Sequence, residues 1–316
     1  MDAKEPTINN DKSNSITKPT VTKSPSCNAE RRFWRSNIPA SELSETLCPI
    51  CGDQRRKFMC EEREYPIWKC KQCGHIYVSP RPSEAVLADY YTTDFMPHTE
   101  DENIYEGKNY GIYDAAARAI VKFMPHRGDL LDVGAGFGGF LERASKDGWR
   151  LSGIELSESA LAVCQRRLGS KAHLSQASFE QVKIAPCSFD CVVMLNVIEH
   201  VRDPLKVCRR AFEILRPGGC LALRWPQHIF NQYLAPPDHL HAFTRRSIEK
   251  LLCSGGFACT REFWAGTKDY RDCGLTKYVQ AIVLRAAARV LLSCTLGRRQ
   301  IPFVSRLTLG RKPRQA

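Results

Sequence analysis

The sequence of 316 residues contains no long hydrophobic run, and this absence excludes whole classes of protein. No stretch of about 18 apolar residues occurs, so we expect no membrane-spanning helix. The first residues are polar and include no apolar segment of a secretory signal, so we expect a cytoplasmic protein. The 15 cysteines are odd in number and scattered through apparent core strands, which fits a reducing compartment rather than a disulfide framework.

Acidic residues are scarce toward the C-terminus, and the basicity of the chain is concentrated there. From Arg261 onward 12 Lys or Arg residues stand against three acidic ones, within a formal net charge of +12 for the whole chain. Residues 275–296 have helical spacing, with Val279 and Ile282 on one face and the arginines away from it. This helix could dock on the protein body, form a dimer contact, or bring 275–299 to an anionic membrane surface. Basic charge also suits a polyanion such as RNA.

Apolar residues are rare in residues 1–43, so this N-terminal tail is predicted to be disordered. Residues 44–82 then carry two C-x-x-C pairs, Cys48 with Cys51 and Cys70 with Cys73. Four thiolates on two such knuckles can enclose Zn²⁺ tetrahedrally, so the spacing predicts a zinc ribbon, with reduced free thiols as the alternative. Zinc with four protein ligands keeps no open position, so its predicted role is structural.

Residues 83–125 are predicted to be a helical linker and lid, with helices over 83–91 and 110–124 and a polar loop over 92–108. From 126 to 316 strands and helices alternate, which predicts an α/β domain with a parallel sheet wrapped by helices. The predicted strands are 129–134, 150–155, 171–175, 189–195, 219–225, 257–264 and 303–310, and the predicted helices are 138–147, 157–168, 203–215 and 245–254.

A glycine-rich turn after the first strand of this domain organises the chain. The turn follows Asp132 and leads into a helix, so that its backbone N–H groups can face a ligand. A second strand ends about twenty residues later at Glu155, an acid that can accept two hydrogen bonds from a ribose. This pattern predicts a nucleotide-type cofactor. The glycines fit both G-x-G-x-G and the dinucleotide signature G-x-G-x-x-G, so the turn alone leaves the cofactor class open.

Four motifs in a fixed order narrow that choice. The Asp132-Val-Gly-Ala-Gly-Phe-Gly turn, Glu155, the run from Ser188 through Asn196-Val-Ile-Glu-His, and Leu215-Arg-Pro-Gly-Gly together resemble class I S-adenosylmethionine-dependent methyltransferases. The resemblance covers roughly residues 105–310. It implies a seven-stranded Rossmann-like sheet of order 3-2-1-4-5-7-6 with an antiparallel last strand, S-adenosylmethionine as cofactor, and an inserted helix at about 270–300.

The resemblance also implies which residues contact the cofactor. The glycine turn lies by the methionine portion, Asp132 helps to hold its amino group, and Glu155 takes both ribose hydroxyls. Residues after the second and third strands flank the adenine, and Asn196 with Val197 lines the methionine side. The full set is Asp132, Gly134, Ala135, Gly136, Gly138, Glu155, Leu156, Ala177, Ser178, Phe179, Asn196 and Val197.

Three histidines are candidate bases for removing a proton from a hydroxyl acceptor. His239, within Asp238-His-Leu-His, matches the residue of the subgroup that also carries the zinc ribbon, and we favour it over His241 and His200. That subgroup is linked with methylation of bacterial polysaccharides, glycolipids and secondary metabolites. Glu199-His200 also resembles a metal site of ubiquinone-type O-methyltransferases, in which an acid lies three residues before the Glu. Asn196 stands there instead, and an amide oxygen is a poorer Mg²⁺ ligand than a carboxylate.

The favoured function is therefore O-methylation of a small molecule or a glycan-type acceptor, with lipid-linked acceptors reached through the basic helix. The main alternative is methylation of RNA bases, because zinc-fingered RNA methyltransferases share this architecture. A sugar C-methyltransferase and a non-catalytic cofactor-binding scaffold are further alternatives. The intact glycine turn and Glu155 argue against the scaffold.

Overall fold

The computed structural model describes residues 35–93, 102–226, 234, 236–264 and 305–314, and its largest element is a seven-stranded sheet. The strand order, β12-β13-β10-β9-β6-β7-β8, confirms the predicted order 3-2-1-4-5-7-6. Four neighbouring pairs are parallel, whereas β13 runs antiparallel to both β10 and β12. The strands are β6 (Asp129–Val133), β7 (Arg150–Glu155), β8 (Ala172–Gln176), β9 (Phe189–Leu195), β10 (Leu215–Pro226), β12 (Ala258–Trp264) and β13 (Ser305–Arg311).

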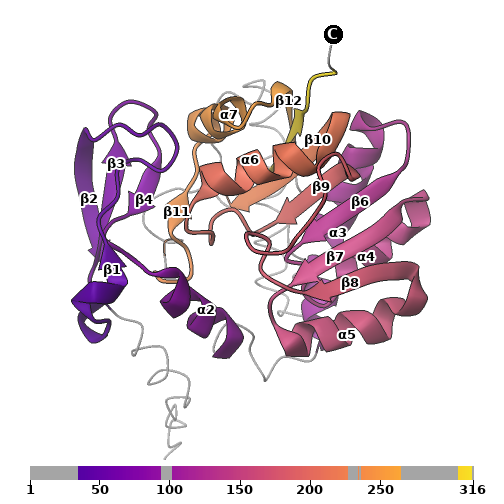
Figure 1. Cartoon of the computed structure of the whole chain (residues 1–316), viewed down its shortest axis with the longest axis horizontal. Coiled ribbons are helices and arrows are strands. Elements are labelled where there is room, and N and C mark those ends of the chain that lie inside the picture. The colour runs from indigo at the N-terminus through magenta and orange to yellow at the C-terminus, as the bar shows by residue number, and fades with distance from the viewer. Residues whose placement is uncertain (1–34, 94–101, 227–233, 235, 265–304, 315–316) are drawn as a thin grey trace, which may run out of the picture.

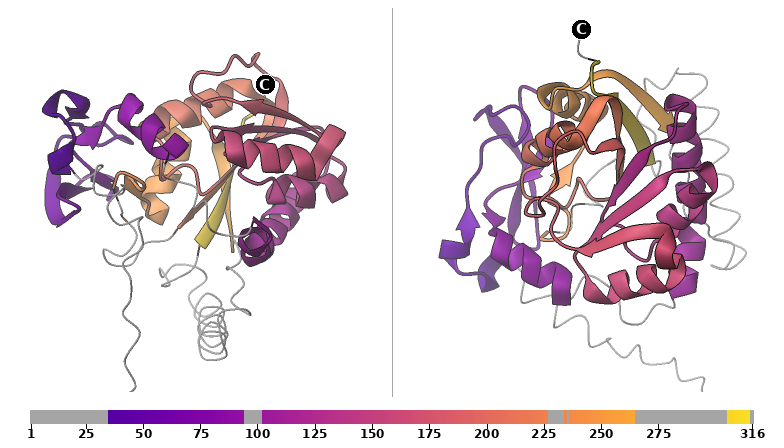
Figure 2. Two further views of the ribbon diagram at one scale, coloured as in Figure 1. Left: turned by 90° about the horizontal axis from the view of Figure 1, so that it is seen from below. Right: turned by 45° about the vertical axis from the view of Figure 1, so that its right-hand side comes forward.

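Helices cover both faces of this sheet (Figures 1 and 2). Alternate side chains of each central strand enter different cores, as the pleat requires: Leu131 packs in one cluster and Leu130 in the other. α6 and α7 belong to the first cluster, and α3, α4 and α5 to the second. The helices are α3 (Glu102–Phe123), α4 (Gly139–Ala144), α5 (Glu158–Leu168), α6 (Pro204–Ile214) and α7 (Arg245–Ser254), with short 3-10 turns η3 (Ser145–Asp147) and η4 (Gly169–Lys171).

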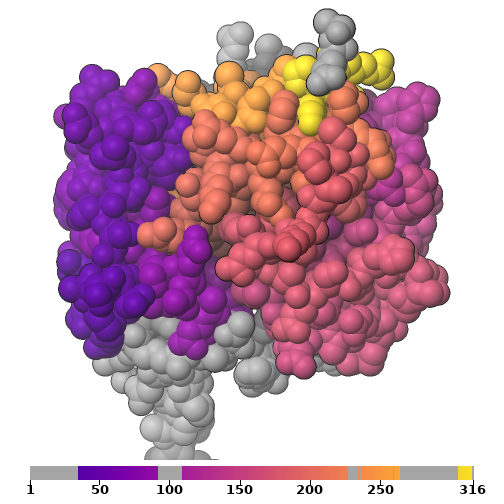
Figure 3. Space-filling model, in the orientation of Figure 1, coloured from indigo at the N-terminus to yellow at the C-terminus, as the bar shows by residue number. Residues whose placement is uncertain are grey.

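A smaller four-stranded sheet, of order β11-β4-β3-β2, lies beside the large domain. Three of its strands come from the predicted ribbon: β2 (Arg56–Glu62), β3 (Tyr65–Cys70) and β4 (Ile76–Val78). The fourth, β11 (His241–Ala242), comes from the loop after β10 and was not predicted. Figure 3 shows the N-terminal residues (indigo to violet) packed against the second half of the chain (orange). We call residues 44–82 the ribbon.

The boundary of the predicted disordered tail requires correction, whereas residues 1–34 of that tail and 94–101 of the predicted lid lie outside the described residues. Residues 35–43, predicted to be disordered, form η1 (Arg35–Asn37), η2 (Ala40–Glu42) and the start of β1 (Leu43–Ser44), which pairs with β5 (Arg81–Pro82). Ile38 supplies the missing packing, since it is 7% exposed in a cluster with Tyr65 and Leu87.

Two helices link the ribbon to the sheet. α2 (Glu84–Thr93) matches the predicted short helix, and α3 begins at Glu102 inside the segment predicted to be a loop. The Glu and Lys residues of that segment are good helix formers, so the helix extends beyond its apolar part. The basic helix predicted at 275–296 lies outside the described residues. Within those residues no helix is long and apolar enough to cross a membrane.

Candidate functional site

The turn between β6 and α4 is braced by Glu155 at the end of the neighbouring strand. One oxygen of its carboxylate accepts a hydrogen bond from the N–H of Gly136 at 2.8 Å. The other accepts from the N–H groups of Leu156 at 2.7 Å and Ser157 at 2.8 Å. The carboxylate therefore joins the two strand ends on which a nucleotide-type ligand is expected.

Two glycines of this turn are required by the backbone and its neighbours. Gly134 has φ +72°, and a Cβ on it would lie 2.7 Å from Cγ2 of Val197. Gly138 has φ +85°, and a Cβ on it would lie 2.7 Å from Sγ of Cys164. Gly136 differs, because a Cβ there would meet no atom within 4 Å. The turn is thus packed closely behind Gly134 and Gly138 and open at Gly136.

The other predicted cofactor residues lie at the same edge of the sheet. Asp132 is 2% exposed near the end of β6, and the N–H of Ala135 donates to Ile154 at 3.0 Å. The N–H of Ala177 donates to the carbonyl of Glu155 at 3.1 Å. These contacts bring the carboxyl ends of β6, β7 and β8 together around the turn.

Phe179 and Asn196 are held by cations that the sequence did not single out. The ring of Phe179 is 5% exposed in the core, with the guanidinium of Arg210 5.3 Å from its centre. Asn196 has φ +59° after β9, and its Oδ1 accepts a hydrogen bond from Arg224 of β10. Arg224 is 5% exposed, within the apolar run 220–225 that the sequence predicts to be a strand.

An acid–histidine cluster lies where β9 ends and the loop before β11 returns. Nδ1 of His200 is 2.9 Å from Oδ1 of Asp238, and Nε2 of the same ring is 4.0 Å from Oε1 of Glu199. His239 packs edge-on against His200 with ring centres 4.6 Å apart, and its Nε2 is 3.7 Å from Oδ2 of Asp238. Sequence reasoning identified the histidines but not their pairing with Asp238.

The charges of this cluster are set by its surroundings. Burial opposes the charge on His200, but Asp238 and then Glu199 outweigh it and raise the pKa of His200 to about 9. Burial likewise raises the pKa of Asp238, but the adjacent histidines win and the pKa stays below its ordinary value. At neutral pH, His200 is therefore an imidazolium paired with the Asp238 carboxylate. The hydroxyl of Tyr91, from α2, donates to the carbonyl of Asp238 at 2.9 Å.

His241 is separated from this cluster although it is two residues from His239. Its ring is fully buried, with Nδ1 3.1 Å from Nε2 of His75 and Nε2 2.9 Å from the carbonyl of Val201. Burial and the neighbouring His75 hold the pKa of His241 well below its ordinary value. This position suits a structural contact with the ribbon and does not suit a base that must reach an acceptor.

Three ligand-type atoms of Glu199, His200 and His239 lie within 4.8 Å of one another, which also fits contact with one metal ion. A metal would have to displace a proton from His200, whose pKa Asp238 and Glu199 raise, so the two would compete for this ring. Oδ1 of Asn196, the position at which an acid would complete such a site, is engaged by Arg224. We therefore interpret the cluster as an acid–base group.

The four ribbon cysteines converge on one point. Sγ of Cys48 is 3.5 Å from Sγ of Cys73, Sγ of Cys51 is 3.6 Å from Sγ of Cys70, and all four lie within 4.8 Å of one another. Around zinc, with Zn–S bonds of about 2.3 Å, a tetrahedron of sulfurs has edges of roughly 3.8 Å. Cys60 is not among the four, so the donor set fits one tetrahedral zinc ion.

A cavity of ≈ 850 Å³ opens between the first knuckle and helices α6 and α7. Lys206, Arg209 and Glu213 of α6 and Lys250 of α7 line it. None of the candidate cofactor residues or histidines does, so we assign it no part in the chemistry.

Comparisons with known proteins agree with this geometry. A family model described as a methyltransferase domain matches residues 131–223, from β6 into β10. The ubiquinone biosynthesis O-methyltransferase of Nitrosospira multiformis is 35% identical over 129 residues, which cover 39% of this chain and 52% of that protein. The chain thus spans about half the length of this curated relative.

Solved structures match the fold over a longer span. The 1,6-didemethyltoxoflavin-N1-methyltransferase of Burkholderia thailandensis has a TM-score of 0.53 at 14% identity, covering 82% of this chain and 99% of that one. Phosphoethanolamine N-methyltransferase 2 of Haemonchus contortus has a TM-score of 0.52 at 18% identity, covering 76% and 63%. At these identities the likeness concerns the fold alone.

Proposed function

We propose that the chain is a class I S-adenosylmethionine-dependent methyltransferase that transfers the methyl group of that cofactor to an oxygen of a small-molecule acceptor. One observation carries the proposal. The glycine turn braced by Glu155 and the cluster of Glu199, His200, Asp238 and His239 both follow the carboxyl ends of central strands, where α/β sheets bind ligands. The choice of oxygen is supported by the O-methyltransferase relatives.

The cofactor would be held by the residues that brace the turn. The open side of Gly136 leaves room for its methionine portion beside the backbone. Glu155 would accept from the ribose hydroxyls, and Asp132 would take the amino group. Ala135, Gly138, Leu156, Ala177, Ser178, Phe179, Asn196 and Val197 would complete the cradle. When bound, S-adenosylmethionine supplies a methyl group that is already electrophilic.

His239 is the proposed base, because it is the more exposed histidine of the cluster and lies beside Asp238. Its side chain is 20% exposed, whereas that of His200 is 12% exposed and His241 is fully buried. A ring nitrogen of His239 would take the proton of the acceptor hydroxyl. Asp238, 3.7 Å away, would stabilise the imidazolium that forms.

Glu199 fixes the other side of the cluster. Its side chain is 1% exposed, and its buried Oε2 has no hydrogen-bond partner among the described residues. A buried acceptor without a partner is costly, and the charge of His200, whose Nε2 lies 4.0 Å from Oε1 of Glu199, offsets part of that cost. His200 would balance the charge of Glu199 and Asp238 without entering the proton transfer.

Zinc at the four cysteines is the second proposed group, and its role is structural because all four ligands come from the protein. The glycan, lipid and RNA acceptors suggested by the family resemblance and the basic charge draw no support from the described residues. The basic segment 275–299, on which the lipid-linked acceptor depends, lies outside them.

A methyl-transfer assay with a matched pair of histidine variants tests the proposal. Hydroxylated aromatic and glycan acceptors are incubated with S-adenosylmethionine, and products gaining one methyl group are identified by mass and fragmentation. His239→Gln should lower kcat by about 10²–10⁴-fold, the usual contribution of a general base, with cofactor affinity unchanged. His173→Gln, at an exposed histidine of β8, is the control. Methylation at nitrogen or carbon, or full activity in His239→Gln, would refute the proposed reaction or base.

A further inference from the structure

The loop that carries Asp238 and His239 is bound into the sheet of the ribbon. His241 and Ala242 of β11 pair antiparallel with Tyr77 and Ile76 of β4. The N–H of Val78 donates to the carbonyl of Leu240 at 3.0 Å. Asp238 and His239 therefore precede, by two residues or fewer, backbone that the ribbon holds in register.

The same short segment is bound on its other side to the end of β9. The N–H groups of Leu240 and His241 both donate to the carbonyl of Glu199, at 2.9 Å and 3.2 Å. The side chain of His241 spans the junction, because it contacts His75 of the ribbon through one ring nitrogen and the carbonyl of Val201 through the other. β11 is thus clamped between the ribbon and the turn that presents Glu199 and His200.

Side chains of the ribbon bind the two chain segments that carry the acid–histidine cluster. Arg63, in the β2–β3 hairpin, donates to the carbonyl of Pro236 at 3.3 Å, just before Asp238. Arg81 donates to the carbonyl of Arg202, and Arg202 donates back to the carbonyl of Pro82 at 3.1 Å and to Ser44 at 2.6 Å. The ribbon therefore grips the loop before β11 and the turn after β9.

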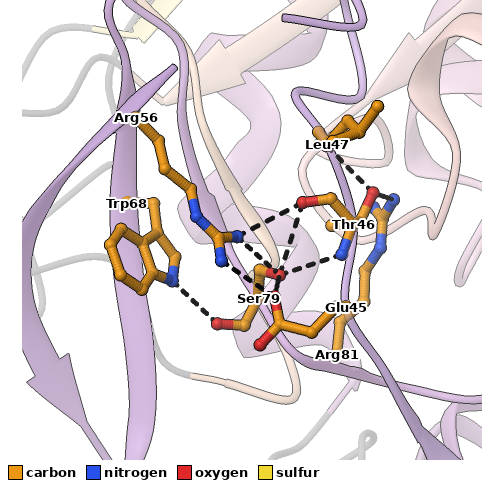
Figure 4. Close-up of polar contacts among 7 residues, drawn as sticks. All are labelled: Glu45, Thr46, Leu47, Arg56, Trp68, Ser79 and Arg81. Atoms are coloured by element: carbon orange, nitrogen blue, oxygen red, sulfur yellow. Dashed lines mark hydrogen bonds and ion pairs between the residues drawn. The ribbon is translucent and has the colours of Figure 1, made fainter. Parts of the chain in front are cut away.

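The ribbon end of this clamp is itself rigidly built (Figure 4). Oγ of Ser79, which follows β4, donates to Glu45 at 2.7 Å and accepts from Arg56 at 3.1 Å. The guanidinium of Arg56 stacks 4.0 Å from the ring centre of Trp68, whose indole N–H donates to the carbonyl of Ser79 at 2.8 Å. These contacts fix the C-terminal end of β4 within the ribbon.

The knuckles and the methyltransferase domain also share one hydrophobic core. Cys48, Cys70 and Cys73 pack in the same buried cluster as Trp225 of β10 and Phe243, next to β11. A cluster of this kind cannot open at the knuckles without exposing apolar surface beside β11. The ribbon is therefore continuous with the domain rather than tethered to it.

We propose that the ribbon is a positioning element of the acceptor site: metal held by its four cysteines fixes β4, and β4 fixes β11 and with it Asp238 and His239 against Glu199 and His200. This inference rests on the proposed function. Because metal binding drives the folding of such small modules, loss of zinc should loosen the acceptor site. The cofactor cradle, built on β6, β7 and their turns, should persist.

Hydrogen exchange of the full-length, zinc-loaded protein tests this without a known acceptor. Cys70→Ser should accelerate exchange of the Leu240 and His241 amides at least about tenfold, while the amides of β6 and β9 stay protected. S-adenosylmethionine affinity, measured by calorimetry, should stay within about threefold. Cys60→Ser, a ribbon cysteine outside the metal set, is the matched control and should change nothing.

A second pair of variants keeps the four cysteines intact. His75→Ala should accelerate exchange at Leu240 and His241, and His75→Gln, which can still hydrogen-bond to His241, should restore most of the protection. Unchanged protection of both amides in Cys70→Ser and His75→Ala would overturn the inference. If Cys70→Ser also unfolds β6, the inference is tested by amide exchange in His75→Ala and His75→Gln alone. Failure to bind S-adenosylmethionine in the wild-type protein would instead overturn the proposed function.

Discussion

Replacing Asp238 by Asn should remove most of the interaction that keeps His200 protonated. The pKa of His200 is raised from its ordinary 6.5 to about 9 against the opposing effect of burial, and Asp238 is the main cause. That difference corresponds to about 3 kcal/mol favouring the imidazolium. An Asn amide of similar shape carries no charge, so we expect the pKa of His200 to fall well below 9, because burial opposes the charge more strongly than Glu199 favours it.

The same interaction makes stability depend on pH in a defined window. Because the folded pKa of His200 lies above the unfolded one, its stabilisation is fully present below pH 6.5 and is lost as pH rises through about 9. His241 acts in the opposite sense. Because the folded pKa of His241 is lowered, its contribution to stability is present above pH 6.5 and is lost as pH falls below that value. The pH dependence of stability above and below pH 6.5 therefore distinguishes the effects of the two histidines.

The assay is NMR titration of the histidine side chains together with urea unfolding between pH 6.5 and 9. The unfolding free energy of the wild type should fall by about 3 kcal/mol more than that of Asp238→Asn across this window. Glu158→Gln, at an exposed acid on α5, is the control and should behave as the wild type. A His200 pKa that stays near 9 in Asp238→Asn would refute the pairing.

Two further predictions concern the glycine turn and the ribbon. Gly138→Ala should cost roughly 2–4 kcal/mol of unfolding free energy, because left-handed backbone and a close contact with Cys164 both oppose a Cβ. Gly148→Ala, which has the same left-handed backbone (φ +81°) but only an ordinary contact 3.9 Å from Cγ of Arg127, should cost only about 1 kcal/mol, and equal costs would contradict the close packing behind the turn. Elemental analysis should find about one zinc per chain. Cys70→Ser should lose the metal and lower the unfolding temperature, whereas zinc retained in that variant would remove Cys70 from the ligand set.

The large sheet could be predicted from the sequence because its signals are local. Each central strand is a short apolar run buried on both faces, and each is bounded by a turn or a helix cap. Ser157 and Asp203 cap α5 and α6 through their side chains, and both helices begin within a residue or two of the predicted position. The strand order followed from the family resemblance and from no local feature.

The parts that were missed depend on contacts between distant residues. β11 is two residues long, and its partners in β4 lie more than 160 positions earlier, so no periodic pattern announces it. The pairing of His200 with Asp238 and the contact of Asn196 with Arg224 are likewise products of the folded topology. Residues 35–43 appeared too polar to pack, yet Ile38 is buried and Leu43 packs against the same cluster.

The three candidate histidines differ in burial and in their partners. The sequence favours His239 over His241 and His200 only through the family resemblance, and the structure places the three rings in three different environments. His200 is an imidazolium beside Asp238, His241 is buried against the ribbon, and His239 is partly exposed. These differences arise from burial and from contacts with residues of other helices, strands and loops. A local sequence motif does not specify such contacts.

Calorimetric titration with S-adenosylmethionine tests the central claim most directly. The wild-type protein should bind the cofactor with one site per chain. Glu155→Ala should weaken binding at least about tenfold, since two charge-assisted hydrogen bonds to the ribose are lost. Glu158→Ala, which removes the same charge three residues away, should bind as the wild type does. Absence of binding, or equal affinity in Glu155→Ala and the wild type, would contradict a methyltransferase cofactor site built on this turn.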